Sequence, residues 1–264
     1  MSANAPTLFA CNNVRIEVSG RTLVDALDFE VGRGELLAVL GQNGSGKTLT
    51  MHTLAGLRPV SQGEVLLDGQ NVAASNRRNI ARQLALLPQH IDDIFPATVL
   101  DTAMIGRHPH IGRFQWESAN DFDIGRAALA SVDLGDLARR DVLTLSGGER
   151  RRLAIAQVLT QQPDVYLLDE PTNHLDPQHQ LDTLRLFREK VDNGAAVIAS
   201  LHDVNLAVRY ADRCLLLYGD GRWDIGTTEN VLDEKRLSEL YATCMESVAW
   251  RSSRLFIASG DVTS

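Results

Sequence analysis

The residues from Gly41 to Thr48, with the sequence GQNGSGKT, have the types and spacing needed to hold a phosphate group. They fit the pattern G-x-x-x-x-G-K-[ST] and lie between an apolar run, residues 36–40, and a segment with apolar residues at helical spacing. Glycines let the backbone approach a phosphate, and N–H groups at a helix N-terminus attract anions. Lys47 can then reach the β- and γ-phosphates of a nucleotide, and the Thr48 hydroxyl can ligate Mg²⁺. The residues expected to bind the nucleotide are Gly41, Gln42, Asn43, Gly44, Ser45, Gly46, Lys47 and Thr48.

A strand, this loop and a helix in that order favour a nucleotide site over a plain glycine-rich turn. Two acidic residues, Asp169 and Glu170, end a second apolar run, residues 164–168. Ligands of α/β proteins bind at the carboxyl ends of parallel strands, so we expect both carboxylates to face the phosphate loop. Asp169 suits the Mg²⁺ shell, directly or through water, and Glu170 is placed to act as general base on an attacking water. Two acids at a strand end also occur as simple turn residues, but the phosphate loop makes that alternative weaker.

His202 occupies a similar position, because it follows the apolar run 195–200, which predicts another buried strand. A lone histidine is usually structural, but this position favours a role near the γ-phosphate.

His108 and His110 form an H-x-H pair that could bind a metal ion. Pro109 between them and the lack of a third ligand favour a loop instead.

Ser146 and Glu149 form the pattern S-x-x-E, a capping box that opens a helix extending to Gln161. Gly147 and Gly148 fall in its first turn, where glycine disfavours the helix. The two glycines make sense if a ligand must lie close against the N–H groups there. The helix N-terminus is therefore a second candidate phosphate site, in preference to an ordinary capped helix.

The hydrophobic pattern before the phosphate loop predicts strands. Residues 14–18 and 22–31 alternate and are bounded by glycine turns, which indicates antiparallel sheet. Beyond residue 90, helical patterns replace strand patterns up to about residue 160, with helices expected at residues 99–106, 121–132 and 149–161. Short apolar strands and helices then alternate, and residues 248–258 predict a hairpin. The chain is therefore expected to form an α/β core with a helical insertion of about residues 90–160.

Composition agrees with one large α/β domain, since 264 residues carry 44% hydrophobic and 23% charged side chains. The net charge of −8, without a basic stretch, argues against a nucleic-acid partner. No apolar run approaches the roughly 18 residues of a membrane span, and the N-terminus does not resemble a signal peptide. The three cysteines lie far apart, without metal-binding spacing, which suggests reduced thiols in a cytosolic compartment: Cys11, Cys214 and Cys244.

Taken together and in order, these motifs resemble those of the nucleotide-binding subunit of an ATP-binding-cassette (ABC) transporter along nearly the whole chain. The matching segments are Gly41 to Thr48 for the Walker A loop, Gln89 for the Q-loop, LSGGE at residues 145–149 for the family signature, residues 166–169 for Walker B, Leu175 and Asp176 for the D-loop, and His202 for the switch histidine. The resemblance implies a P-loop NTPase of α/β class over residues 7–255. Its RecA-like, mostly parallel sheet would carry an N-terminal antiparallel β subdomain and an inserted helical subdomain, with residues 1–6 and 256–264 as tails.

The resemblance also implies ATP and Mg²⁺ as cofactors and assigns roles to single residues. Glu170, His202 and Gln89 would be catalytic, and Thr48, Gln89 and Asp169 would hold the metal. A head-to-tail dimer is implied, in which signature residues of one copy close over ATP held by Lys47 of the other. The residues expected to contact ATP across that dimer are Ser146, Gly147, Gly148, Glu149 and Asp176.

Integral-membrane permease subunits are the second implied partner, with a substrate-binding protein as an indirect one. The chain would be peripheral, at the cytoplasmic face of the inner membrane. The helical insertion and Gln89 would contact the permease, with Ile91, Ile94 and Phe95 as apolar contacts for its coupling helix.

Two departures from the family pattern stand out. The family usually places an aromatic ring on adenine at the position of Val18, so we expect weaker or differently built base recognition, with Arg15 or Phe9 helping. The D-loop is unusual in having Asn173 and His174 before Leu175.

Residues 99–110 resemble a segment of importers of ferric siderophores, haem and vitamin B12. A single cassette without a fused membrane domain also fits an importer built from separate subunits. An ABC ATPase for another cargo or an exporter stays open, as does a soluble ABC ATPase of DNA repair or translation. Soluble members usually carry two cassettes or a long coiled-coil insertion, and a P-loop kinase would leave the signature unexplained.

Overall fold

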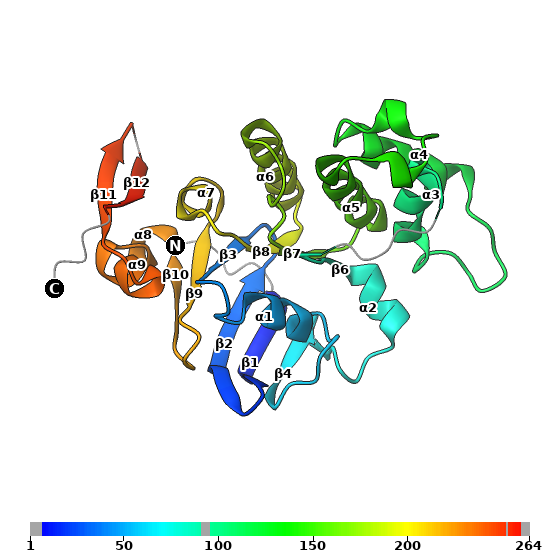
Figure 1. Cartoon of the computed structure of the whole chain (residues 1–264). Coiled ribbons are helices and arrows are strands. Elements are labelled where there is room, and N and C mark those ends of the chain that lie inside the picture. The colour runs from blue at the N-terminus through cyan, green and yellow to red at the C-terminus, as the bar shows by residue number, and fades with distance from the viewer. Residues whose placement is uncertain (1–6, 91–95, 252, 260–264) are drawn as a thin grey trace.

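The computed structural model describes residues 7–90, 96–251 and 253–259. A four-stranded antiparallel sheet comes first in the chain and has the order β2-β1-β4-β5 (Figure 1). Its strands are β1 (Thr7–Val18), β2 (Arg21–Gly32), β4 (Gln62–Leu67) and the short β5 (Gln70–Asn71). The predicted alternation is therefore confirmed, and β1 begins seven residues before the predicted strand.

The six-stranded core sheet has the order β10-β9-β3-β8-β7-β6. Its strands are β3 (Leu36–Leu40), β6 (Leu84–Leu87), β7 (Val165–Asp169), β8 (Ala196–Ser200), β9 (Arg213–Leu217) and β10 (Trp223–Thr227). All neighbours pair in parallel except β10, which runs antiparallel to β9 at the edge. Every residue of β3, β7 and β8 is buried, as expected for strands covered on both faces.

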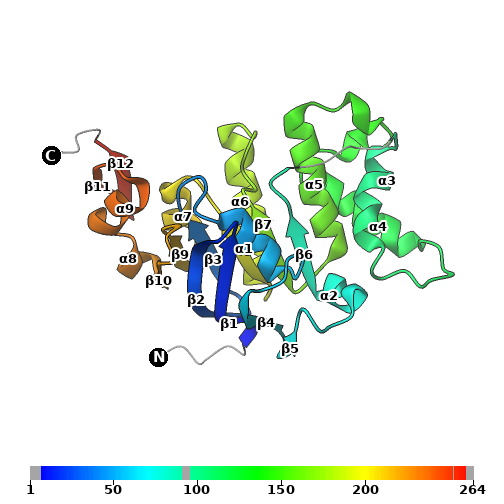
Figure 2. The same cartoon turned by 60° about the horizontal axis from the view of Figure 1, so that its bottom comes forward.

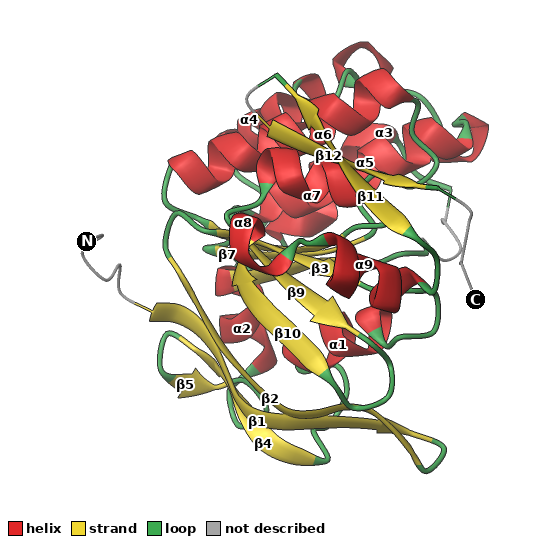
Figure 3. Ribbon diagram, turned by 90° about the vertical axis from the view of Figure 1, so that its left-hand side faces the viewer, coloured by secondary structure: helices red, strands yellow, loops and turns green. Residues whose placement is uncertain are grey.

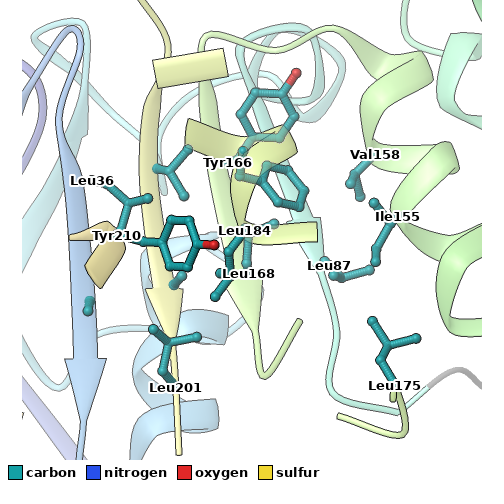
Figure 4. Packing of buried hydrophobic residues seen from close by; sticks show 14 of the residues in the cluster. Leu36, Leu87, Ile155, Val158, Tyr166, Leu168, Leu175, Leu184, Leu201 and Tyr210 are labelled. Atoms are coloured by element: carbon teal, nitrogen blue, oxygen red, sulfur yellow. The ribbon is translucent and has the colours of Figure 1, made fainter. Parts of the chain in front are cut away.

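Two hydrophobic layers cover this sheet. On one face, α1 (Lys47–Leu54) packs between the core and the antiparallel sheet, so that Met51 and Leu54 join Leu37 and Val39 in one cluster (Figure 2). On the other face lie the helices that follow the insertion, α6 (Pro177–Asp192) and α7 (Val204–Tyr210). Figure 4 shows side chains of this layer, including Leu36 beside Tyr210, and Leu168 and Leu184.

The predicted helical insertion is confirmed. Within described residues 96–160 there is no strand, apart from one isolated bridge between Thr98 and Asp141. Its elements are α3 (Val99–Met104), the 3-10 turns η1 (Ile105–Arg107), η2 (Gly135–Leu137) and η3 (Val142–Thr144), α4 (Ala119–Ala130) and α5 (Gly147–Gln161), preceded by α2 (Arg77–Gln83). Arg107 joins the helices, since its Nε lies 2.8 Å from Asp121 Oδ1 and its Nη1 donates to the carbonyl oxygen of Thr160.

The C-terminal part combines a confirmed prediction with a missed strand. Short helices α8 (Thr228–Val231) and α9 (Glu234–Tyr241) were expected, as was the hairpin of β11 (Met245–Trp250) and β12 (Ser253–Ala258). Strand β10 was not, because only Trp223 and Ile225 alternate in its five residues, WDIGT; it adds to the open edge beside β9 (Figure 3). None of the helices in the described ranges has the length and hydropathy to cross a membrane.

Candidate functional site

The phosphate loop lies between β3 and α1, as the sequence predicts. Gly44 and Gly46 adopt φ angles of 81° and 102°, which favour glycine. A Cβ on Gly41 would lie 2.4 Å from Ser45 Oγ, so a side chain there would not fit. Lys47 Nζ donates to the carbonyl oxygens of Gly41, at 2.7 Å, and Gln42, at 3.2 Å. The lysine therefore lies folded across its own loop, and burial lowers its pKa against the opposing effect of the nearby carboxylates.

Asp169 ends β7 and is fully buried, and its charge acts on Lys47 of the phosphate loop, where it favours the protonated amine. Register explains its surroundings, because Asp169 pairs with Ser200 at the end of β8. Ser200 Oγ donates to Asp169 Oδ1 at 2.6 Å and accepts from the Glu170 N–H at 2.8 Å. Asp169 Oδ2 is buried and has no hydrogen-bond partner among the described residues.

A chain of hydrogen bonds joins the other predicted residues. Thr48 Oγ1 donates to Gln89 Oε1 at 3.2 Å, and Gln89 Nε2 donates to Glu170 Oε2 at 2.7 Å. On the far side, His202 Nε2 lies 2.5 Å from Glu170 Oε1. Asn173 Nδ2 also donates to Glu170 Oε2. Residues from three separate segments thus meet at the Glu170 carboxylate, and Thr48 joins them through Gln89.

The backbone of Glu170 has a φ of 52°, in the left-handed region. A non-glycine residue there costs about 1–2 kcal/mol. Such local strain persists only where the surrounding structure holds it. At this position it turns the chain out of β7 and carries the carboxylate into the cleft.

The donor set fits a magnesium ion coordinated through oxygen. Thr48 Oγ1, at the start of α1, neighbours Gln89 Oε1, and Asp169 at the end of β7 offers the buried, unpartnered Oδ2. Magnesium prefers such oxygen ligands and usually keeps several waters, which an aspartate can hold.

The H-x-H pair at residues 108–110 belongs to no metal-binding cluster, since the described ranges contain no suitable group of three or more His, Cys, Asp or Glu. His110 Nε2 instead donates to the carbonyl oxygen of Gln161. The loop interpretation of the H-x-H pair is therefore favoured.

A cleft of about 830 Å³ opens over the phosphate loop. Its walls include Val18, Lys47, Glu170 and His202. Because Val18 lines the cleft and is 36% exposed, the position expected to contact adenine does face the cleft. Phe9 is fully buried in the core, and the suggestion that it helps to hold adenine is wrong.

Arg15 does not line the cleft either, because its guanidinium pairs with Glu17 at 2.8 Å and bonds Thr22. Arg21, which sequence reasoning missed, lines the wall beside Val18 and donates to the carbonyl oxygen of Gly219 at 2.7 Å. A second cavity of about 740 Å³, near Tyr218, contains none of the predicted site residues.

The capping box of α5 is present. Ser146 Oγ accepts from the Glu149 N–H at 3.3 Å, and Glu149 Oε2 accepts from the Ser146 N–H at 2.7 Å, which lowers the pKa of Glu149. Open space surrounds a Cβ placed on Gly147. Asp176 caps α6 by accepting from the His179 N–H. None of these residues lines the cleft of its own chain.

Residues 24–173, more than half of the chain, match the family model described as ABC transporter. The chain belongs to the ABC transporter family. It is 41% identical over 234 residues to the hemin import ATP-binding protein HmuV of Pseudomonas fluorescens Pf-5, covering 87% of this chain and 90% of that protein. It is 37% identical over 220 residues to the petrobactin import ATP-binding protein FpuD of Bacillus anthracis, covering 83% and 81%.

Among solved structures, an inward-facing ABC transporter described as of metal-chelate type superposes with a TM-score of 0.82 at 27% identity. The match covers 96% of this chain and 97% of that chain. The predicted family and α/β fold are thus confirmed. The chain is an ABC ATPase, which binds ATP and couples its hydrolysis to transport. ATPases of this family dimerise and pair with permease subunits.

Several contacts in this ABC ATPase site involve residues that sequence reasoning missed. Ser200 ends a buried strand, and its position beside Asp169 follows only from the pairing of β7 with β8. Asn173 was noted only as unusual in its motif, and its bond to Glu170 depends on the turn that follows β7. The expected permease contacts Ile91, Ile94 and Phe95 lie outside the described residues.

Proposed function

We propose that this chain is the ATP-hydrolysing subunit of an importer for a metal chelate such as a ferric siderophore, haem or cobalamin. Separate integral-membrane permease subunits carry the cargo, and a substrate-binding protein delivers it. The catalytic part of this proposal rests on the cleft residues around Glu170, where Gln89 and His202 contact the carboxylate and Thr48 bonds Gln89. The similarity to the hemin and petrobactin import ATP-binding proteins supports the cargo class.

The residue roles follow from the contacts. Residues 41–48 hold the phosphates, with Lys47 turning from its carbonyl partners to the β- and γ-phosphates. Glu170 orients and deprotonates the attacking water, while His202 holds the carboxylate from the other side. Mg²⁺, held by Thr48, Gln89 and Asp169, would supply positive charge to the phosphate oxygens when bound.

A head-to-tail dimer would complete the site. Ser146 and Gly147 lie outside the cleft of their own chain, at the N-terminus of α5, where helix N–H groups favour an anion. In a symmetric pair, the same surface of each copy can close over the ATP of the other. Gly148, Glu149 and Asp176 belong to the same proposed surface.

Mixing two inactive variants tests the dimer. Ser146→Arg should bind ATP but not hydrolyse it, and Lys47→Ala should fail at its own phosphate loop. In a mixed dimer, one site carries both defects and the other is intact. If sites act independently, an equal mixture should recover about one quarter of the wild-type rate, since about half of the dimers are mixed. Absence of any recovery would contradict independent composite sites.

Purification from membranes tests the partners. A tagged chain should copurify with a polytopic membrane protein, as expected for a peripheral ATPase at the cytoplasmic face of the inner membrane. Recovery of ribosomes or DNA instead would favour a soluble ABC ATPase.

Growth tests the cargo. Cells lacking this chain should lose growth on a ferric siderophore or haem as sole iron source, or lose cobalamin uptake, and plasmid-borne wild type should restore it. A plasmid with Glu170→Gln is the matched control and should not restore growth. Unchanged uptake of all three chelates in the deletion strain would contradict the proposed cargo class.

A further inference from the structure

Helix α5 carries three consecutive arginines whose side chains do different things. Arg150 donates to the carbonyl oxygens of Leu143 and Leu145, close to its own helix N-terminus. Arg152 donates to those of Val132 and Asp133 in the helical insertion. Arg151 points into the core sheet instead and is only 2% exposed.

Among the described residues, every hydrogen bond of the Arg151 guanidinium goes to a backbone carbonyl at or just beyond the end of β6 or β7. Nη1 donates to Pro88 at 2.6 Å and Gln89 at 3.3 Å, at the end of β6. Nη2 donates to Asp169 and Glu170, both at 2.7 Å, at the end of β7. A single planar fork therefore holds the backbones from which Gln89 and Glu170 project.

The carbonyl of Pro171 accepts a fifth, longer bond from Arg151 Nε, at 3.4 Å. The bonds to the carbonyls of Asp169, Glu170 and Pro171 flank the left-handed backbone of Glu170. They hold the turn that directs its carboxylate into the cleft. Burial lowers the pKa of Arg151 to about 10, so the guanidinium stays charged at neutral pH. The negative charges of Asp169 and Glu170 favour the protonated form of Arg151.

We propose that Arg151 is a positioning residue that links the N-terminus of α5 to the catalytic geometry of Gln89 and Glu170. Arg151 begins the second turn of the helix whose first turn carries Ser146 and the two glycines. A movement of that helix end on contact with ATP would be passed directly to both strand ends through the guanidinium fork. The proposal rests on the proposed role of Glu170 as general base, and it assigns Arg151 an effect on turnover rather than on ATP binding.

Three variants of the full-length chain test this. Arg151→Gln removes the charge and most of the donors, while Arg151→Lys keeps the charge but loses the planar fork. Arg152→Gln is the matched control, since it changes the neighbouring arginine whose carbonyl partners lie in the insertion. The measurements are kcat and KM for ATP hydrolysis, the Kd for ATP, and Tm.

We expect kcat to fall about 10–100-fold in both Arg151 variants, because small misplacements of catalytic groups have effects of that size. The Kd for ATP should stay within about twofold, as expected when only transition-state interactions are lost. Arg152→Gln should keep its kcat. Wild-type kcat in Arg151→Lys would overturn the proposal, because charge alone would then suffice. If Arg151→Gln does not fold, Arg151→Lys alone decides.

A double-mutant cycle separates positioning from general destabilisation. In the Glu170→Gln background, Arg151→Lys should lower the residual single-turnover rate by less than about threefold, because it acts through the carboxylate already removed. An equal loss in both backgrounds, or a rate loss matched by lost ATP binding and lower Tm, would overturn the proposal. A Glu170→Gln variant with the wild-type rate would instead refute the role of Glu170 itself, and the Arg151 proposal with it.

Discussion

Glu170→Gln is the sharpest perturbation of this site, because it keeps the shape of the side chain and removes only its charge. In the wild type, both carboxylate oxygens accept hydrogen bonds. Oε2 accepts from Gln89 and Asn173, and Oε1 faces His202 at 2.5 Å. Glutamine has a single acceptor oxygen and an NH₂ group that cannot accept. The oxygen can keep the two amide donors, which leaves the NH₂ group facing His202 and no base for the attacking water.

The size of the effect follows from that loss. Removal of a general base costs about 10²–10⁴ in rate, or about 2.7–5.4 kcal/mol of transition-state stabilisation. ATP binding should change little, because Lys47 and Thr48, the proposed ligands of the phosphates and Mg²⁺, form no hydrogen bond with Glu170. The variant should therefore bind ATP, fail to turn it over, and accumulate as a closed dimer.

Single-turnover hydrolysis and size-exclusion chromatography with and without ATP measure these outcomes. Exposed Glu189 on α6 provides the matched control, since Glu189→Gln removes the same charge away from the cleft and should leave both measurements unchanged. Hydrolysis by Glu170→Gln at the wild-type rate would refute the general-base role. A monomer at saturating ATP would refute the dimer step.

Three further outcomes are expected. Lys47→Ala should abolish hydrolysis and weaken ATP binding, because the phosphates lose their cation, and an unchanged steady-state ATPase rate would count against the phosphate loop. Val18→Tyr should tighten ATP binding by about 0.5–1.5 kcal/mol if an added ring stacks on the base, and titrations with ATP and GTP that show no gain would mean that another residue holds it. Asp121 has a pKa lowered from 3.8 to about 2, first by hydrogen bonds from Ser118 and then by Arg107. Its contribution to stability, on the order of 1 kcal/mol, is present above pH 4 and lost towards pH 2. Urea unfolding of Asp121→Asn should show a smaller loss over that range than the wild type, and equal losses would contradict the assignment.

Much of the site could be predicted from the sequence because its parts are contiguous. The phosphate loop is one uninterrupted pattern whose glycines, lysine and hydroxyl follow a strand and open a helix. The ends of β7 and β8 were found for the same reason, since a run of apolar residues marks a buried strand and the next polar residue marks its end. Parallel pairing then brings Glu170 and His202 to one edge.

What could not be predicted depends on contacts between segments. Phe9 and Val18 lie on the same strand, and only the observed packing shows that the first is in the core and the second at the cleft. The three arginines of α5 are equivalent in the sequence. The orientation of the helix about its axis determines that Arg151, and not Arg152, reaches the ends of β6 and β7. Strand β10 pairs through its backbone at a sheet edge, and its two apolar side chains, Trp223 and Ile225, are too short a pattern to predict it.

The two acids at the end of β7 show why local geometry matters more than adjacency. Successive residues of a strand point to opposite faces, so Asp169 and Glu170 could not both reach the cleft if β7 simply continued. Asp169 stays in the sheet and is buried against Ser200. Glu170 leaves it in a left-handed conformation, and its N–H is held by Ser200 and its carbonyl by Arg151. Glycine would relieve the strain there but would remove the carboxylate, so the cost is retained at the position of the proposed general base.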